Sequence, residues 1–250
     1  MMPSTRDESV RKLACDVWTY RLESELDAAD HFRALAPTLR ALGASPSLVE
    51  MANEAASDEL RHASLCRELI VHFGGALPTE KPRVRAGRIA PAGLEGGERV
   101  LYEIVALSCI TETLSTALLG ELVARALDPV CKQAMHSVLR DEVNHSRLGW
   151  AFLAEERGRG ARDCVGQHVP EMLEAALGPH FFSFADAPNA QQKELATLGA
   201  LERPERQRIV RETLESVIVP GLERFGIETS PTKRWLDLNP TTPVQSTVSG

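Results

Sequence analysis

The sequence predicts an all-α protein: a four-helix bundle with one long crossover, followed by additional C-terminal helices. Four stretches repeat apolar residues every three or four positions, the period of helices that bury one face. Short turns join the first stretch to the second and the third to the fourth, whereas about 23 residues, 75–97, separate the second from the third. Acidic residues, with a histidine in two cases, interrupt the apolar face of every stretch.

In the first pair of helices, residues 8–42 place Glu25 on the apolar face with Trp18, Leu22 and Ala29. Its neighbour Glu23 instead shares a face with polar residues. Gly43 ends this helix, and Ser45-Pro46 supplies a capping residue and an N1 proline for a helix over 46–73. Glu59 and His62 interrupt the apolar stripe of that second helix.

The third helix, residues 98–127, is apolar over most of its surface and places Glu112 inward near its midpoint. Asp128-Pro129 then begins a fourth helix that runs to about residue 156, with Glu142 and His145 on its apolar face. The Gly- and Pro-rich segment 75–97 reads as an irregular crossover. Two antiparallel pairs joined by one long crossover are one of the known four-helix-bundle topologies.

Beyond the bundle (8–157) we expect a helical extension packed on it (158–238) and a disordered tail (239–250). The extension contains predicted helices over 162–177 and 204–225, and Pro220 should bend or break the second of these. Between them lies an aromatic cluster, Phe181, Phe182 and Phe184, which we interpret as core packing or, alternatively, a substrate lid.

Composition excludes several classes of protein. The 250 residues are 43% apolar, which suffices for one large domain. The net charge of −7, with no run rich in Lys or Arg, argues against a nucleic-acid partner. Four charged residues interrupt the longest apolar segment, 100–127, so no membrane span is expected.

Cysteine usage and the N-terminal sequence bear on the compartment. The five cysteines form an odd set with no Cys-x-x-Cys pair, and we interpret them as reduced thiols. Residues 1–8 carry charges but lack the apolar region of a secretory signal. The sequence therefore predicts a cytoplasmic protein.

Two near copies of one motif carry the chemistry. Asp58-Glu59-Leu60-Arg61-His62 and Asp141-Glu142-Val143-Asn144-His145 both read D-E-x-x-H. On a helix, Glu and His at i and i+3 share a face, so both can reach one metal ion. One copy would carry little information, but two copies in helical patterns, alternating with inward Glu25 and Glu112, form a set.

This set is the pattern of a dinuclear carboxylate site in a helical bundle. Two divalent cations would neutralise four buried carboxylates, which are otherwise strongly unfavourable. Oxygen ligands with two imidazoles suit iron or manganese. The alternative is a set of buried structural ion pairs. The predicted metal ligands, which with Thr116 are also the predicted catalytic residues, are Glu25, Glu59, His62, Glu112, Glu142 and His145.

Residues 8–157 resemble the ferritin-like di-iron carboxylate superfamily. The stretch Asp58–His62 is similar to the D/E-E-x-R-H motif of bacterial multicomponent monooxygenases and acyl-carrier-protein desaturases. The resemblance implies that Asp58 accepts a hydrogen bond from His145 and that Asp141 accepts one from His62, which orients each ring. Arg61 is then a partner of Asp141 or a plain surface ion pair. Asn144 replaces the arginine in the second copy.

Other positions narrow the resemblance. Two E-x-x-H motifs are unlike most storage ferritins, which carry one site histidine. Cys66 stands where radical-forming reductase subunits place a tyrosine, and Val138 where arylamine N-oxygenases place an extra histidine. Thr116 resembles the threonine of the monooxygenase oxygen pocket, or simply bonds to its own helix. In length and ligand spacing the chain is closer to the aldehyde-deformylating oxygenases.

Our first hypothesis is a non-haem di-iron oxygenase or oxidase that activates O₂ at a buried dinuclear site and oxidises a small organic substrate. Its cofactor would be two iron ions, with manganese or a mixed pair possible, and it would need an external electron donor. A monomer or homodimer is expected. The alternative is a ferritin- or rubrerythrin-like protein that handles only Fe(II), O₂ or peroxide. A bundle whose site has become structural is the third, non-enzymatic hypothesis.

Overall fold

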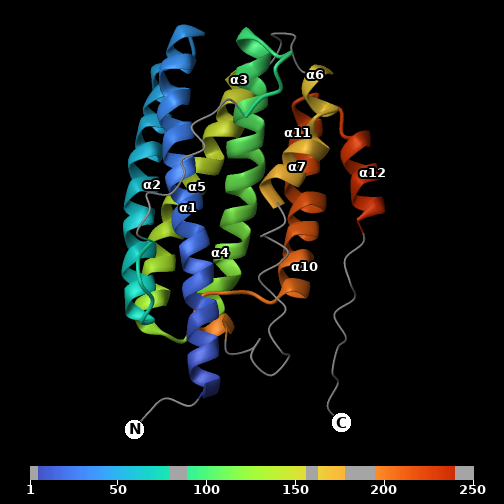
Figure 1. Ribbon diagram of the computed structural model, residues 1–250. Coiled ribbons are helices and arrows are strands. Elements are labelled where there is room, and N and C mark those ends of the chain that lie inside the picture. The colour runs from blue at the N-terminus through green and yellow to red at the C-terminus, as the bar shows by residue number, and fades with distance from the viewer. Residues whose placement is uncertain (1–4, 79–88, 156–162, 178–194, 240–250) are drawn as a thin grey trace.

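The computed structural model describes residues 5–78, 89–155, 163–177 and 195–239, and its regular elements within these ranges are all helices (Figure 1). The bundle consists of α1 (Thr5–Ala41), α2 (Pro46–His72), α3 (Gly96–Ile104) continued by η1 (Val105–Glu112) and α4 (Thr113–Arg125), and α5 (Pro129–Glu155). These bounds agree with the predicted ones to within about one helical turn. The predicted all-α fold, with one long crossover between α2 and α3, is confirmed, and the topology is ferritin-like.

Local sequence signals account for the ends of α1 and α2 and for the start of α5. Gly43 and Gly74 follow α1 and α2 with φ angles of 74° and 83°, a left-handed conformation that glycine adopts without steric cost. At the start of α5, Asp128 Oδ1 accepts a hydrogen bond of 2.8 Å from the Cys131 backbone N–H. The Ser45 side chain does not make the expected capping bond, since its Oγ lies 3.0 Å from Ser47 Oγ, and its backbone N–H donates to Glu155 Oε1 at 2.8 Å.

The apolar core of the bundle is divided into two clusters, and on α1, α2 and α5 the predicted metal ligands lie between them. On α1 the buried residues Trp18 and Leu22 belong to one cluster, whereas Phe32 and Leu35 belong to the other. The same division holds on α2 and α5, whereas Glu112 lies at the edge of the cluster that contains Phe32, between its members Ile110 and Leu114, and the other cluster begins at Leu119. Apolar packing above and below therefore fixes the height of the site along the bundle.

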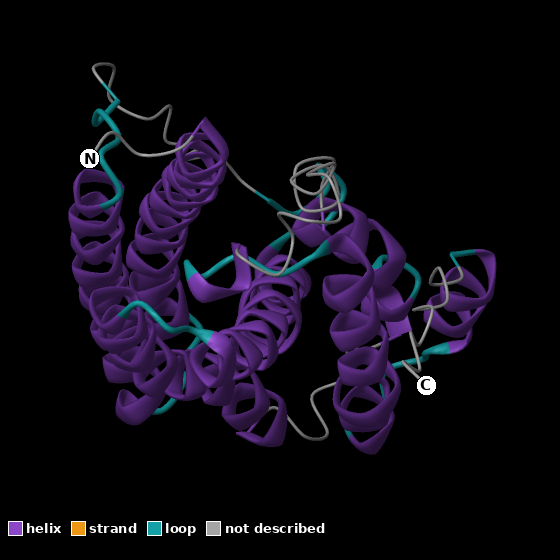
Figure 2. Cartoon of the chain, turned by 90° about the horizontal axis from the view of Figure 1, so that it is seen from below, coloured by secondary structure: helices purple, strands orange, loops and turns teal. Residues whose placement is uncertain are grey.

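The C-terminal helices lie along one side of the bundle (Figures 1 and 2). They are α6 (Asp163–Gly166), α7 (Val169–Leu177), α10 (Arg203–Thr213), η2 (Leu214–Ile218), α11 (Val219–Arg224) and α12 (Ser230–Leu238). α7 packs against η1, and α10 packs against α4. Just before α10, the Trp18 indole N–H donates to the Leu198 carbonyl at 3.0 Å and ties this segment to α1.

Two details of the extension differ from the sequence prediction. The expected helix over 162–177 is two helices, because Pro170 favours a new start at the beginning of α7. At Pro220 we expected a bend or a break, and the chain stays helical there, so no break occurs. The π-helix η2 immediately before it widens the turn and accommodates the missing N–H. The aromatic cluster at residues 181–184 and the tail after residue 239 lie outside the described residues.

One helical run, Gly96–Arg125, is long and apolar enough by composition to cross a membrane. However, 67% of its most apolar window is buried inside the protein. This run is η1 with its flanking helices α3 and α4, and it carries Glu112 into the bundle. Its apolar character is therefore accounted for by its place in the core.

Candidate metal centre

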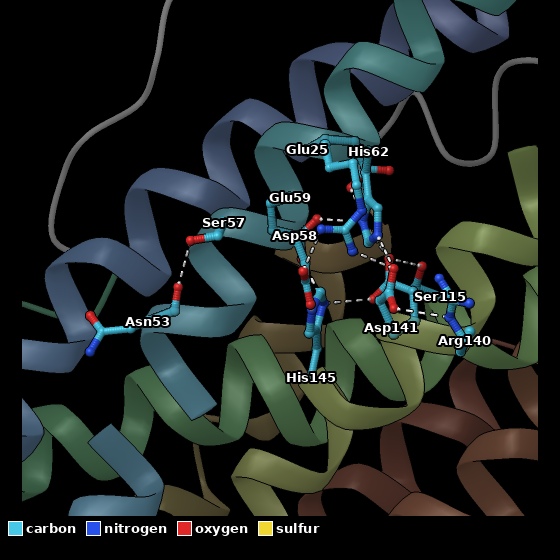
Figure 3. A network of polar contacts seen from close by, with 12 residues as sticks. Glu25, Asn53, Ser57, Asp58, Glu59, His62, Ser115, Arg140, Asp141 and His145 are labelled. Atoms are coloured by element: carbon cyan, nitrogen blue, oxygen red, sulfur yellow. Dashed lines mark hydrogen bonds and ion pairs between the residues drawn. The ribbon is translucent and has the colours of Figure 1, made fainter. Parts of the chain in front are cut away.

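Six side chains, predicted from the sequence to bind metal, converge from the four bundle helices. Figure 3 shows Glu25 of α1, Glu59 and His62 of α2 and His145 of α5 pointing toward one another. Glu112 and Glu142 complete the cluster, and both are almost fully buried. Glu25 keeps 15% of its side chain exposed, and it also lines a cavity described below. Glu23, the alternative on α1, is exposed.

The cluster divides into two overlapping groups of four possible ligands. In each group, one ligand atom from every residue lies within 4.8 Å of the others. Glu59 and Glu142 belong to both groups, so their carboxylates can face two ions at once. One group is Glu25, Glu59, His62 and Glu142, and the other is Glu59, Glu112, Glu142 and His145.

The two histidines use their ring nitrogens in the same way. His62 turns Nδ1 toward Glu59 at 3.1 Å and Nε2 toward Asp141 Oδ2 at 3.3 Å. His145 turns Nδ1 toward Glu59 at 2.9 Å and Nε2 toward Asp58 Oδ2 at 3.3 Å. The contacts that the sequence resemblance implied for Asp58 and Asp141 are thus present. A carboxylate at Nε2 favours the tautomer in which Nδ1 is free to bind a cation.

Arg61 connects the two aspartates. Its Nη1 donates to Asp58 Oδ1 at 2.7 Å and its Nη2 donates to Asp141 Oδ2 at 2.6 Å. Desolvation disfavours the charged form of Asp141, but the hydrogen bonds from Arg61 and His62 outweigh it and lower the pKa of this carboxyl group. Of the two alternatives left open for Arg61, the structure shows the contact with Asp141.

Burial raises the pKa values of Glu25 and Glu112, the two glutamates that each belong to only one ligand group. Desolvation, reinforced by the negative charge of Glu59, raises the pKa of Glu25 well above its usual value. Desolvation, reinforced by the charge of Glu142, does the same to the pKa of Glu112. The four carboxylates therefore do not share this space as four anions unless cations accompany them.

In the histidines and Glu59, by contrast, the charged form is favoured. Desolvation opposes their charged forms, but close contacts with groups of opposite charge in the cluster outweigh it. They raise the pKa of His62 to about 11 and that of His145 to about 10, and they lower the pKa of Glu59. The cluster therefore holds protons at neutral pH that divalent cations would displace.

Unsatisfied polar atoms test whether metal ions fit these residues. Among the described residues of the cluster, Glu59 Oε1, Glu142 Oε2 and His145 Nδ1 are buried without a hydrogen-bond partner. His145 Nδ1 lies close to both oxygens, at 2.9 and 3.4 Å, but without hydrogen-bond geometry. Proteins rarely leave such groups unpaired. A shared cation would satisfy all three, so the donor set fits a metal pair.

A π-helix positions Glu112. Residues Val105–Glu112 form η1, an eight-residue insertion of wider turns between α3 and α4. π-turns inside α-helices are rare and often occur at functional sites. Gly149 of α5 allows close contact here, since a Cβ atom at this position would lie 2.6 Å from Cys109 Sγ. The inward direction of Glu112 was predicted correctly, but the π-turn that produces it was not.

A cavity of about 200 Å³ adjoins the cluster. All four clustered glutamates contribute to its lining. Its walls are mainly apolar and come from α1, α2, α4, α5 and the C-terminal segments; they include Trp18, Leu65, Leu119, Met135, Val138 and Leu201. A small organic molecule in this cavity would lie directly beside the carboxylates.

Hydroxyl groups near the site differ from the sequence expectation. Thr116 donates its Oγ1 to the Glu112 carbonyl at 2.8 Å, the local helix bond, and it does not line the cavity. Ser115 does line it and lies 3.5 Å from Glu142 Oε1. The geometry therefore favours Ser115 as the hydroxyl beside the carboxylates, and a role for Thr116 in an oxygen pocket stays a prediction.

Cys66 and the remaining histidines lie near or outside the centre. Cys66 is buried and lines the cavity, and burial raises the pKa of its thiol well above the usual value, which disfavours the reactive thiolate. Neither ligand group contains His31, His72, His136 or His168. His180 lies outside the described residues.

Two cavity residues, Arg21 and Arg206, were not identified from the sequence. Each lies on an apolar helical stripe: Arg21 falls between Trp18 and Glu25, and Arg206 precedes Ile209 by three positions. A cation on an apolar face is the signal that could have identified them.

Comparison with known proteins supports the fold. A solved structure described as "Protein 19 with aldehyde deformylating oxidase activity from Synechococcus" matches this chain with a TM-score of 0.60 and 16% sequence identity. The match covers 92% of this chain and 97% of that chain. No protein-family model and no curated protein sequence matches the chain. The likeness is therefore one of three-dimensional fold over nearly the whole of both chains.

Proposed function

We propose that this protein is a non-haem dinuclear metal oxidase or oxygenase that uses O₂ to oxidise a small organic substrate. Glu59 and Glu142 would be shared by two metal ions, with Glu25 and His62 completing one set of ligands and Glu112 and His145 the other. The observation that carries this proposal is the overlap of the two ligand groups at two buried carboxylates. The aldehyde deformylating oxidase activity of the structural neighbour is consistent with it.

Iron is the proposed metal, with manganese or a mixed pair as the other possibilities, because the donors are hard oxygens and imidazoles. Bound there, two Fe(II) ions would supply electrons for reducing O₂. The chain itself would orient both imidazoles through Asp58 and Asp141 and exclude bulk water by burial. Full reduction of O₂ takes four electrons, of which the two Fe(II) ions together would supply two and the organic substrate two, so an external electron donor would be needed to return the metal ions to Fe(II).

The cavity favours an organic substrate over the alternative in which Fe(II), O₂ or peroxide are the only substrates. Its lining is mostly apolar and reaches four glutamates of the cluster, whereas iron ions alone would need a polar path. Size-exclusion chromatography distinguishes the two functions, because the oxygenase is expected as a monomer or homodimer. A large closed cage would instead favour iron storage.

Metal analysis combined with oxidation kinetics tests the proposal. Protein purified from iron-supplemented cells should contain close to two metal ions per chain, and bound Fe(II) should be oxidised rapidly on mixing with O₂. Glu142→Ala should abolish this oxidation, whereas Glu121→Gln, a change at a partly exposed glutamate of the same bundle, should leave it intact. A folded protein with no bound metal, or unchanged kinetics in Glu142→Ala, would refute the proposed centre.

A further inference from the structure

The cavity beside the candidate metal centre has opposite charges in its lining. Glu25, Glu59, Glu112 and Glu142 form its acidic part, whereas Arg21 and Arg206 are the cationic residues of the lining. The remaining lining is mainly apolar. Binding of the proposed metal ions accounts for the four glutamates in the lining. The two arginines have no part in holding those ions.

Arg206 reaches the cavity from the C-terminal extension. It lies in the first turns of α10, which packs against α4, and only 9% of the residue is exposed. Desolvation lowers the pKa of its guanidinium to about 10, and the nearby positive charges of Arg21 and Arg203 act in the same direction. Arg206 therefore brings a buried positive charge to the wall of an otherwise acidic and apolar cavity.

Arg21 approaches the same region from α1. Its guanidinium carbon lies 4.6 Å from the centre of the Trp18 ring, a cation–π contact that fixes the side chain. Among the described residues, no carboxylate lies within ion-pair distance of Arg21. Arg21 precedes Glu25 by four residues, so the two positions are about 6 Å apart along the helix axis.

We propose that the cavity binds an amphipathic organic anion, whose carboxylate pairs with Arg206 and Arg21 while its apolar body extends toward the four glutamates. Guanidinium groups bind carboxylates with paired, charge-assisted hydrogen bonds, and the attraction is strong where water is excluded. This inference names the substrate class of the proposed oxygenase and therefore rests on the proposed function.

The cavity also limits the size and orientation of this substrate. Its volume of about 200 Å³ is below the roughly 300–1,000 Å³ typical of sites for drug-sized ligands, which indicates a short carbon chain. With the carboxylate held by the arginines, the end of the molecule remote from it lies nearest the glutamates. The arginines would thus select both the class of the substrate and the position presented to the metals.

Calorimetric titration of the full-length protein with hexanoate, hexan-1-ol and hexylamine tests the inference. Hexanoate should bind at least about tenfold more tightly than the alcohol, and hexylamine should bind most weakly. Arg206→Gln and Arg21→Gln should each weaken hexanoate binding by about tenfold or more and leave binding of the alcohol nearly unchanged. Arg203→Gln, which removes a charge from an exposed position at the start of α10, is the matched control and should change neither.

Specific outcomes would overturn the inference. Equal binding of hexanoate and hexanol, or equal weakening in Arg203→Gln and Arg206→Gln, would show that no anion site exists. Loss of hexanoate binding on treatment with EDTA, but not in Arg206→Gln, would place the carboxylate at the metal ions instead. Circular dichroism and melting curves verify folding, and Arg206→Lys, which keeps the charge but not the planar fork, replaces Arg206→Gln if that variant does not fold.

The titration is independent of the proposed oxidation chemistry, since it measures binding without turnover. Retained preference for hexanoate in a protein that does not react with O₂ would refute the proposed function but leave the anion site. Rapid Fe(II) oxidation without any preference for hexanoate would refute the anion site but leave the proposed function.

Discussion

Arg61 of α2 and Asp141 of α5 are joined by a hydrogen bond of 2.6 Å, although they belong to different helix pairs of the bundle. The same guanidinium holds Asp58 at 2.7 Å, and these two aspartates contact His145 and His62 (Figure 3). One surface arginine therefore holds both aspartates that contact the histidines of the candidate metal centre, and this is what we call its bracing role.

Arg61→Gln should weaken metal binding with little loss of stability. The Arg61 side chain is 46% exposed, so its ion pairs should contribute no more than about 1 kcal/mol to the free energy of unfolding. Loss of the brace should nevertheless reduce metal affinity, which a competition titration with a chromophoric chelator would measure. Arg33→Gln, which breaks the exposed pair with Asp30, is the control. An equal loss of affinity in both variants would contradict the bracing role.

Asp58→Asn and Asp141→Asn should reduce metal affinity more strongly than Arg61→Gln. An amide still fills the space but no longer stabilises the N–H at Nε2 as a carboxylate does. Replacing such partners of metal-binding histidines typically costs about 10–100-fold in affinity or activity. The same chelator titration applies, with exposed Glu68→Gln on α2 as the control. Wild-type affinity in both asparagine variants would mean that neither aspartate orients its histidine.

Metal uptake should release protons at neutral pH. In the metal-free protein the pKa is about 11 for His62 and about 10 for His145, so both imidazoles are protonated at pH 7. The raised pKa values of Glu25 and Glu112 act in the same direction, toward proton release on metal binding. Since metal ions bind only the deprotonated groups, affinity should rise with pH through neutrality.

Calorimetry in two buffers of different ionisation enthalpy would count these protons. Release of two or more per loaded chain is expected, and the Glu142→Ala variant, which lacks a shared carboxylate, should release fewer. An uptake free of proton release would show that the cations bind elsewhere.

Much of the candidate centre was predictable because its residues follow the helical period. Glu59, His62, Glu142 and His145 interrupt apolar stripes, and a charged residue on such a stripe is either paired inside the core or bound to a cation. Glu25 could be preferred over Glu23 for the same reason. The single long crossover then placed the four helices in one topology.

The features that sequence patterns did not predict depend on tertiary packing. The π-turns of η1 contain no glycine or proline that would mark a change of helix geometry, so the sequence does not distinguish them from an ordinary α-helix. Arg206 reaches the cavity only because α10 packs against α4, a contact between distant parts of the chain. The aromatic residues at 181–184 remain untested, since they lie outside the described residues.

Gly149→Ala should destabilise the protein and disturb the centre together. An added Cβ would lie 2.6 Å from Cys109 Sγ and 3.0 Å from the Cys109 backbone nitrogen, so η1 would have to move. Overpacking of this kind costs about 1–3 kcal/mol, and because η1 carries Glu112, metal affinity should fall as well. Urea unfolding and chelator titration measure the two effects.

Gly120→Ala should stabilise the protein, in contrast to Gly149→Ala. Gly120 lies on the exposed surface of α4, and apart from its chain neighbours and the nearby backbone of its own helix no atom lies within 4 Å of a Cβ added there. Alanine should therefore stabilise the helix by about 0.5–1 kcal/mol through its lower backbone entropy, without an effect on metal binding. Since both substitutions add one methyl group to a helical glycine, a loss of stability in both would show that helix packing at Gly149 is not the cause.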